Sequence, residues 1–64
     1  MVVLSKNGEG AEVGLTRDEL IMLNNAMNEV CNGVHIDDDE FQTRLAFERN
    51  EIRALLEQVS EVLK

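Results

Sequence analysis

This chain has a single cysteine, Cys31, and therefore cannot form the internal disulfide on which many very short domains depend. With only one histidine, it also has no Cys/His cluster for a structural zinc site. A chain of 64 residues is close to the lower limit for a self-sufficient core, because it buries only ~60% of the surface that its unfolded form exposes. We therefore expect one domain, residues 1–64, whose remaining support comes from self-association or from a partner.

The acidic excess of the chain limits its partners. There are 13 Asp and Glu residues against 6 Lys and Arg residues, which gives a formal net charge of −7. Such a charge repels both nucleic acid and anionic membrane surfaces, so we expect no membrane partner, and nucleic acid is disfavoured. At the same time, 44% of the residues are hydrophobic, too many for a disordered acidic segment, and we expect a folded domain.

The sequence predicts no targeting or membrane segment. No cationic segment followed by a long apolar run opens the chain, and no stretch approaches the ~20 apolar residues that a membrane span needs. A lone free thiol is typical of a reducing compartment. Together these features predict a cytoplasmic protein.

Residues 1–15 predict a two-stranded antiparallel β-hairpin. Asn7-Gly8 is a strong signal for a two-residue turn, because both positions of that turn need a positive φ. This register places Lys6 opposite Glu9 and turns Val3 to one face of the hairpin. The other face then carries the remaining apolar residues, namely Val2, Leu4, Ala11, Val13 and Leu15.

A first helix is predicted over residues 16–32. Thr16 and Glu19 have the spacing of a capping box, in which each side chain bonds the backbone amide of the other residue. Asn32-Gly33 is a suitable end, because glycine tolerates the left-handed conformation at a helix terminus. The apolar residues that follow the helical period are Leu20, Leu23, Met27 and Val30.

Two more helices are expected, over residues 37–45 and 48–63, after a connector at residues 34–36. Ala46-Phe47 separates the two helices. The last helix has a regular apolar stripe, formed by Ile52, Leu55, Leu56, Val59, Val62 and Leu63. The predicted fold class is therefore α+β: an N-terminal two-stranded antiparallel hairpin followed by three helices, long, short and long.

The acidic run from Asp37 to Glu40 invites a comparison with calcium-binding loops. In an EF-hand numbered from Asp37, the sixth position needs glycine but holds Gln42, and Phe41 occupies an oxygen-ligand position. Carboxylates at a helix start also complement the exposed N–H groups and the positive end of the helix dipole. We expect this capping role and no metal.

No catalytic constellation emerges from the sequence. Cys31 and His35 are four residues apart, but Gly33 interrupts the helix between them, and neither an oxyanion donor loop nor a third orienting residue is evident. A lone cysteine at the end of an apolar helix is usually packed in the core. We expect no enzyme activity, no catalytic residue and no cofactor.

Four asparagines lie within nine residues of the first helix, although Asn is a poor former of helix interiors. They are Asn24, Asn25, Asn28 and Asn32. The simpler interpretation is an exposed polar surface with a C-terminal cap. The alternative is a buried amide that bonds backbone groups of the hairpin, the connector or a second chain.

Residues 41–56 resemble a helix-turn-helix, with a short helix, a small residue at Ala46, an apolar residue and an amphipathic helix. The resemblance implies that the second helix would offer its first residues to the major groove of DNA, namely Glu48, Arg49, Asn50 and Arg53. Alanine replaces the usual turn glycine, and the helix carries four glutamates. Residues 15–56 are also similar to small bacterial proteins, a similarity that brings no activity with it.

The leading prediction is a non-enzymatic protein-interaction module that docks a partner protein with a basic surface, in the manner of an immunity protein, an antitoxin or an inhibitor. The carboxylates predicted to bind the partner are Asp37, Asp38, Asp39, Glu40, Glu48 and Glu51. Two alternatives stay open: a dimeric DNA-binding regulator that uses residues 41–56, and a structural homodimer. We also expect a homodimer, formed through the hairpin edge or through the helices.

Overall fold

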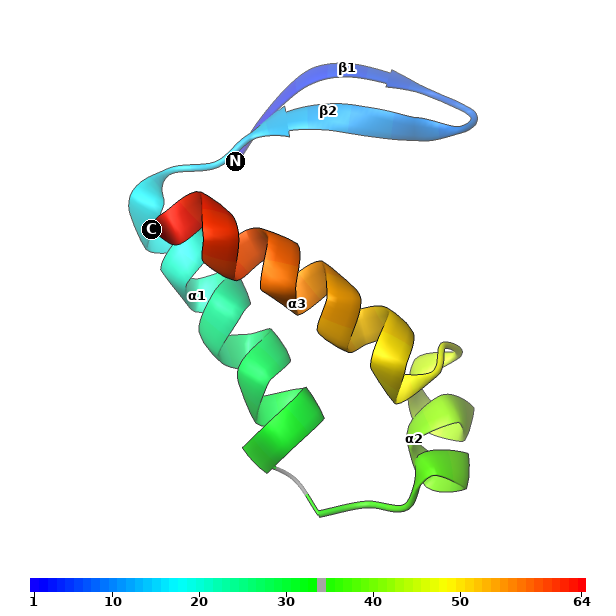
Figure 1. Ribbon diagram of the computed structural model, residues 1–64. Coiled ribbons are helices and arrows are strands. Elements are labelled where there is room, and N and C mark those ends of the chain that lie inside the picture. The colour runs from blue at the N-terminus through cyan, green and yellow to red at the C-terminus, as the bar shows by residue number, and fades with distance from the viewer. Residues whose placement is uncertain (34) are drawn as a thin grey trace.

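The protein is described by a computed structural model that covers residues 1–33 and 35–64. The predicted α+β class is confirmed, because an antiparallel hairpin precedes three helices (Figure 1). A π-helical turn, η1, continues the first helix. The elements are β1 Val2–Asn7, β2 Gly10–Gly14, α1 Arg17–Asn28, η1 Glu29–Gly33, α2 Asp38–Leu45 and α3 Arg49–Leu63.

The long helices α1 and α3 lie side by side and run in opposite directions, with α2 at one end of the pair (Figure 1). The hairpin lies at the other end, beyond the start of α1. At that end Arg17 Nη1 donates a hydrogen bond to the carbonyl of Leu63, at 3.5 Å. The result is a flat molecule of 36 × 29 × 15 Å.

The tip of the hairpin is one residue later than predicted. Lys6 pairs with Ala11, and Asn7 pairs with Gly10, so Gly8 and Glu9 form the turn. The Asn7 carboxamide oxygen accepts from the amides of Glu9 at 2.8 Å and Gly10 at 3.1 Å. The predicted turn needs a positive φ at both Asn7 and Gly8, and neither residue has one. Asn7 instead occupies the first position of the turn, where its side chain bonds the backbone amides that follow.

A β-bulge between Val3 and Ser5 then shifts the pairing again, so that Val3 lies opposite Val13. Directly opposed residues share a face of an antiparallel pair, which puts Val3 on the face of Val13. The predicted apolar face, with Val2 beside Val13, was therefore wrong. Val2 instead lies opposite Gly14.

The start of α1 is the predicted capping box. The Thr16 hydroxyl accepts from the Glu19 amide at 3.1 Å, and Glu19 Oε1 accepts from the Thr16 amide at 2.9 Å. The predicted left-handed end at Gly33 was wrong, because its φ is not positive and the chain makes a π-helical turn through this residue instead. Within that turn Cys31 is buried, with only 2% of its surface exposed, as predicted for a core residue.

Among residues 1–33 and 35–64, Ala46 alone has a left-handed backbone conformation. It ends α2 with a φ of 67° and donates its amide to the carbonyl of Gln42 at 2.8 Å. At the start of α3, Glu51 Oε1 accepts from the Glu48 amide at 3.3 Å. The predicted break between the two helices therefore has a defined backbone geometry.

The core is small and belongs to the helices. Its buried side chains are Cys31, Phe41 and Leu56, from η1, α2 and α3, and Phe41 is fully buried. The partly buried residues that pack against them are Met27, Val30, Ile36, Leu45 and Ile52. Of the predicted connector, residue 34 lies outside the described residues and His35 is exposed. No described helix has the length and apolar character to cross a membrane.

Candidate interaction site at the starts of α2 and α3

The starts of α2 and α3 come together in an open polar cleft. Asp38 and Asp39 reach it from the first turn of α2, and Glu48 reaches it from the residue that precedes α3. The cleft, which we call the acidic cleft, is lined by Asp38, Asp39, Gln42, Glu48, Arg49 and Asn50. Carboxylates are expected at these positions, because a helix start favours negative charge.

Half of the predicted partner-binding carboxylates line this cleft, and the other half lie outside its lining. Glu40 accepts from Arg44 Nε at 2.7 Å, one helical turn away. Glu51 accepts from the Glu48 amide. Asp37 is the N-cap residue of α2, and Asp38, Asp39 and Glu40 occupy its first turn, as expected for carboxylates at a helix start. The expected capping hydrogen bond from the Asp37 side chain does not form.

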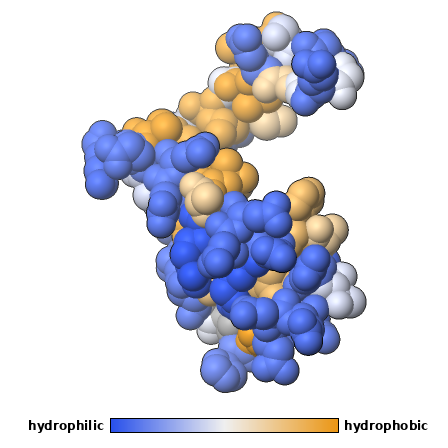
Figure 2. Space-filling model, turned by 45° about the vertical axis from the view of Figure 1, so that its right-hand side comes forward, coloured by the Kyte–Doolittle hydropathy of each residue, from blue (hydrophilic) through white to orange (hydrophobic). Residues whose placement is uncertain are grey.

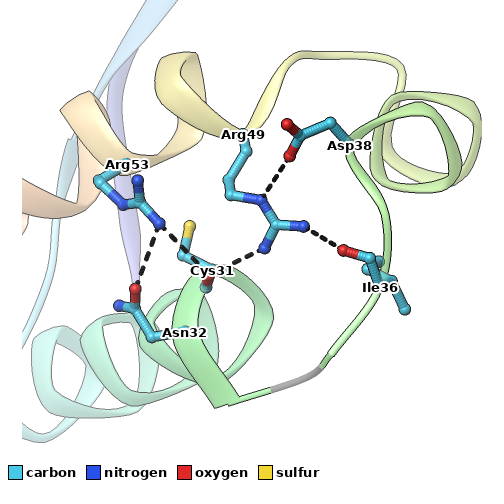
Figure 3. Close-up of polar contacts among 6 residues, drawn as sticks. All are labelled: Cys31, Asn32, Ile36, Asp38, Arg49 and Arg53. Carbon is cyan, nitrogen blue, oxygen red and sulfur yellow. Dashed lines mark hydrogen bonds and ion pairs between the residues drawn. The ribbon is translucent and has the colours of Figure 1, made fainter.

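Arg49 is the cation of the cleft, and its guanidinium bonds three separate segments (Figure 3). Nε donates to Asp38 Oδ1 at 3.1 Å, Nη1 donates to the Cys31 carbonyl at 3.0 Å, and Nη2 donates to the Ile36 carbonyl at 2.6 Å. The guanidinium carbon also lies 4.5 Å from the centre of the Phe41 ring. Arg49 therefore joins η1, the connector and α2 to α3.

This role of Arg49 was missed in the sequence, although one signal for it was present. The α1–η1 helix has no basic residue in its last turn, so its final carbonyls lack a local cation. Arg53 supports Arg49 there, because its Nη2 donates to Asn32 Oδ1 at 3.3 Å and approaches the Cys31 carbonyl at 3.5 Å (Figure 3). Both arginines thus neutralise a helix end within the protein.

The free charge of the cleft is negative. The side chain of Asp38 is 88% exposed although it pairs with Arg49, whose own side chain is only 16% exposed. Among the described residues, neither Asp39 nor Glu48 forms an ion pair. A cation on another molecule would therefore meet exposed carboxylates first, with Arg49 turned toward backbone carbonyls beneath them.

The geometry offers little for metal or acid–base chemistry. Across residues 1–33 and 35–64, no three His, Cys, Asp or Glu side chains converge in a way that would hold a metal ion. Cys31 is buried in the core, whereas His35 is exposed. The two residues therefore lie in different environments, which does not favour a nucleophile–base pair.

The asparagines of α1 and η1 have distinct contacts. Asn24 Oδ1 accepts from the Ser60 hydroxyl of α3 at 2.5 Å, which ties the two long helices together. Asn28 Oδ1 accepts from Asn32 Nδ2 at 2.9 Å, and Asn25 is exposed. Within the chain, Asn24 therefore bonds a side chain of α3 and not a backbone group. A bond to a second chain stays a prediction.

No model of a known protein family matches this chain, and no match to a curated protein or to a solved structure was found.

Proposed function

We propose that this chain is a non-enzymatic protein-interaction module that docks a basic surface of a partner protein in the acidic cleft. The observation that carries the proposal is the convergence of Asp38, Asp39 and Glu48, from two helix starts, on one open cleft. The cation of that cleft is already bonded to backbone carbonyls. The proposal fits an immunity protein, an antitoxin or an inhibitor of an enzyme that acts on nucleic acid.

The mechanism of docking is electrostatic. A net charge of −7 attracts a basic surface over a distance and raises the rate of encounter. On contact, Arg or Lys side chains of the partner would bond the exposed carboxylates of Asp39 and Glu48. Because these carboxylates lie in an open cleft, their desolvation cost is smaller than that of a buried pair.

The alternative of DNA binding has less support from the geometry. It needs Arg49 and Arg53 to reach bases or phosphates, and both donate to Cys31 and its neighbours within the protein. A DNA complex would have to break these bonds and also accept the adjacent carboxylates of Glu48 and Glu51. Phosphate contacts supply most of the nonspecific affinity for DNA, and here the basic side chains for such contacts are already engaged.

A charge reversal in the cleft tests the proposal. Asp39→Lys should reduce the affinity for the cognate partner at least about tenfold, because it places a cation where the partner's cation would bind. The matched control is Glu57→Lys, the same charge change at an exposed residue of α3 outside the cleft. Partners would be captured from cells of the source organism with both variants and the wild type, and their affinities then measured by titration calorimetry at two salt concentrations.

The two variants separate the possible outcomes. Loss of a basic partner by Asp39→Lys alone, with weaker binding at higher salt, would support docking in the cleft. Equal binding by the wild type and Asp39→Lys would overturn it. A mobility shift of DNA at about 50 mM salt would instead favour the helix-turn-helix alternative, since phosphate contacts are strong under that condition.

A further inference from the structure

An apolar groove separates the hairpin from α1, at the opposite end of the molecule from the acidic cleft. We call it the hairpin groove. It is lined by Met1, Val13, Leu15, Glu19, Met22 and Leu23. Met1 and Met22 are 68% and 67% exposed, and the space-filling view shows apolar surface where the hairpin meets the helices (Figure 2).

The groove continues along one face of α1 and η1. Residues 19, 22, 23, 26, 27 and 30 recur at the spacing of a single helical face. Ala26, Met27 and Val30 line a second apolar groove with Leu45 and Ile52. Apolar residues thus line this face from the hairpin to α2. Those of the second groove near α2, except Ala26, are partly buried against the core, whereas none of the hairpin residues is buried.

The amount of exposed surface is too large for a compact monomer. The accessible surface is 5167 Å², whereas a compact protein of 7.2 kDa exposes about 4,100 Å². The excess of roughly 1,000 Å² is close to the ~800 Å² that each partner buries in a standard protein–protein interface. The Cα radius of gyration, 13.2 Å, likewise exceeds the ~11 Å expected for 64 residues.

The occupant that fits this surface is a second copy of the chain. An isolated two-stranded hairpin is marginal in water, and this one adds no buried side chain to the core. Its apolar face therefore needs a cover whenever the chain is folded. A second copy is the partner that is always present in equal amount, and the excess surface of the whole chain is comparable with the area that one protomer buries in a dimer.

The charge distribution permits this contact between two acidic chains. The charged groups among the residues that line the groove are the terminal ammonium of Met1 and the side chain of Glu19. Its carboxylate accepts from the terminal ammonium of Met1 and from the Thr16 amide, and these bonds hold the pKa of Glu19 below its usual value. Two copies can therefore meet here without opposing unpaired like charges, which the acidic cleft would not allow.

We propose that two copies of this chain associate through their hairpin grooves, around a two-fold axis, into a homodimer. Pairing through the edge of β1 is less favourable, because the bulge between Val3 and Ser5 interrupts that edge. The contact leaves both acidic clefts free at the far ends of the helices. The dimer would then present two docking sites.

The oligomeric state and one pair of variants test this proposal. The wild type at about 10 μM should sediment at twice the 7.2 kDa mass of the chain. Met22→Glu should raise the dimer dissociation constant about 100-fold, because the two-fold axis buries the new carboxylate twice. The control is Leu55→Glu, at a 53% exposed residue of α3 outside the groove, which should remain dimeric.

Sedimentation of the wild type and of the two variants distinguishes the proposed interface from the alternatives. A wild type that sediments as a 7.2 kDa species at this concentration would overturn it. So would a dimer that Leu55→Glu disrupts and Met22→Glu does not, since that pattern places the interface on α3. If Met22→Glu unfolds on losing its partner, circular dichroism would show helix content that recovers at high concentration, as expected for a dimer whose folding depends on association.

Discussion

At the scale of single residues, Arg49 bonds more separate segments of the chain than any other described side chain. It satisfies carbonyls of Cys31 and Ile36, pairs with Asp38 and covers the ring of Phe41. Arginine suits this position because its planar guanidinium presents donors in several fixed directions, whereas a lysine ammonium is a point charge. The small core makes such a junction important for stability.

We predict that Arg49→Ala lowers the free energy of unfolding by about 2–4 kcal/mol, because charge-assisted hydrogen bonds to two carbonyls are lost together. Arg49→Lys should recover only part of this loss. The control is Arg44→Ala, which removes an exposed ion pair with Glu40 and should change stability by about 0.5 kcal/mol or less. Urea denaturation measures all three. Equal effects of Arg49→Ala and Arg44→Ala would contradict the role assigned to Arg49.

At the scale of elements, short sequence motifs predicted the start of α1 correctly but misplaced the hairpin turn by one residue. The capping box at Thr16 and Glu19 forms as predicted, because its members are three residues apart in one helical turn. In the hairpin, Asn7 instead bonds the amides of Glu9 and Gly10 through its side chain and moves the turn by one residue. The α2–α3 corner depends on Ala46, which holds a left-handed conformation usual for glycine.

Because Ala46 has a left-handed backbone, we predict that replacing alanine by glycine changes the stability in opposite directions at Ala46 and at Ala54. Ala46→Gly should stabilise the protein by about 0.5–1 kcal/mol, because relief of the left-handed strain exceeds the entropy that glycine adds to the unfolded chain. Ala54→Gly, in the exposed interior of α3, should destabilise it by about 1 kcal/mol. Chemical denaturation of the two variants checks this contrast. The same sign for both would show that Ala46 is not strained.

At the scale of the whole molecule, the helices enclose a small core, whereas the apolar surface between the hairpin and α1 is uncovered. The core gathers Cys31, Phe41 and Leu56, whereas the hairpin lies beyond it and the hairpin groove stays open. The acidic cleft lies at the opposite end of the helices. The proposed dimer and the proposed docking site therefore use separate surfaces, and either can fail without the other.

Coupling of folding to association predicts a melting temperature that depends on protein concentration. Between about 5 and 500 μM, the Tm of the wild type should rise by about 10 °C, given the usual unfolding entropy per residue for two chains of 64 residues. Differential scanning calorimetry over this range measures the effect. For Met22→Glu, the folded fraction at 5 μM should be lower than that of the wild type. A Tm that is constant over the range would argue against obligate dimerisation.

The candidate site was predicted in part. Asp38, Asp39 and Glu48 followed from the pattern of acidic helix starts, and the structure brings them to one cleft. Asp37, Glu40 and Glu51 shared that pattern but lie outside its lining, because the direction of each side chain depends on where it falls around its helix. The pattern alone gave no means of separating the two groups.

The sequence by itself determined the elements and their order, because its signals act between residues that are close along the chain. The capping box of α1, the acidic start of α2 and the apolar stripe of α3 each lie within one element. Only the tertiary structure decided the pairing across the hairpin, the inward direction of Arg49 and the exposure of the α1 face. Arg49 lies 18 residues from the carbonyl of Cys31 that it bonds. Such contacts form only when distant elements pack. A local pattern, such as the lack of a basic residue at the end of the α1–η1 helix, therefore cannot identify the residue that makes them.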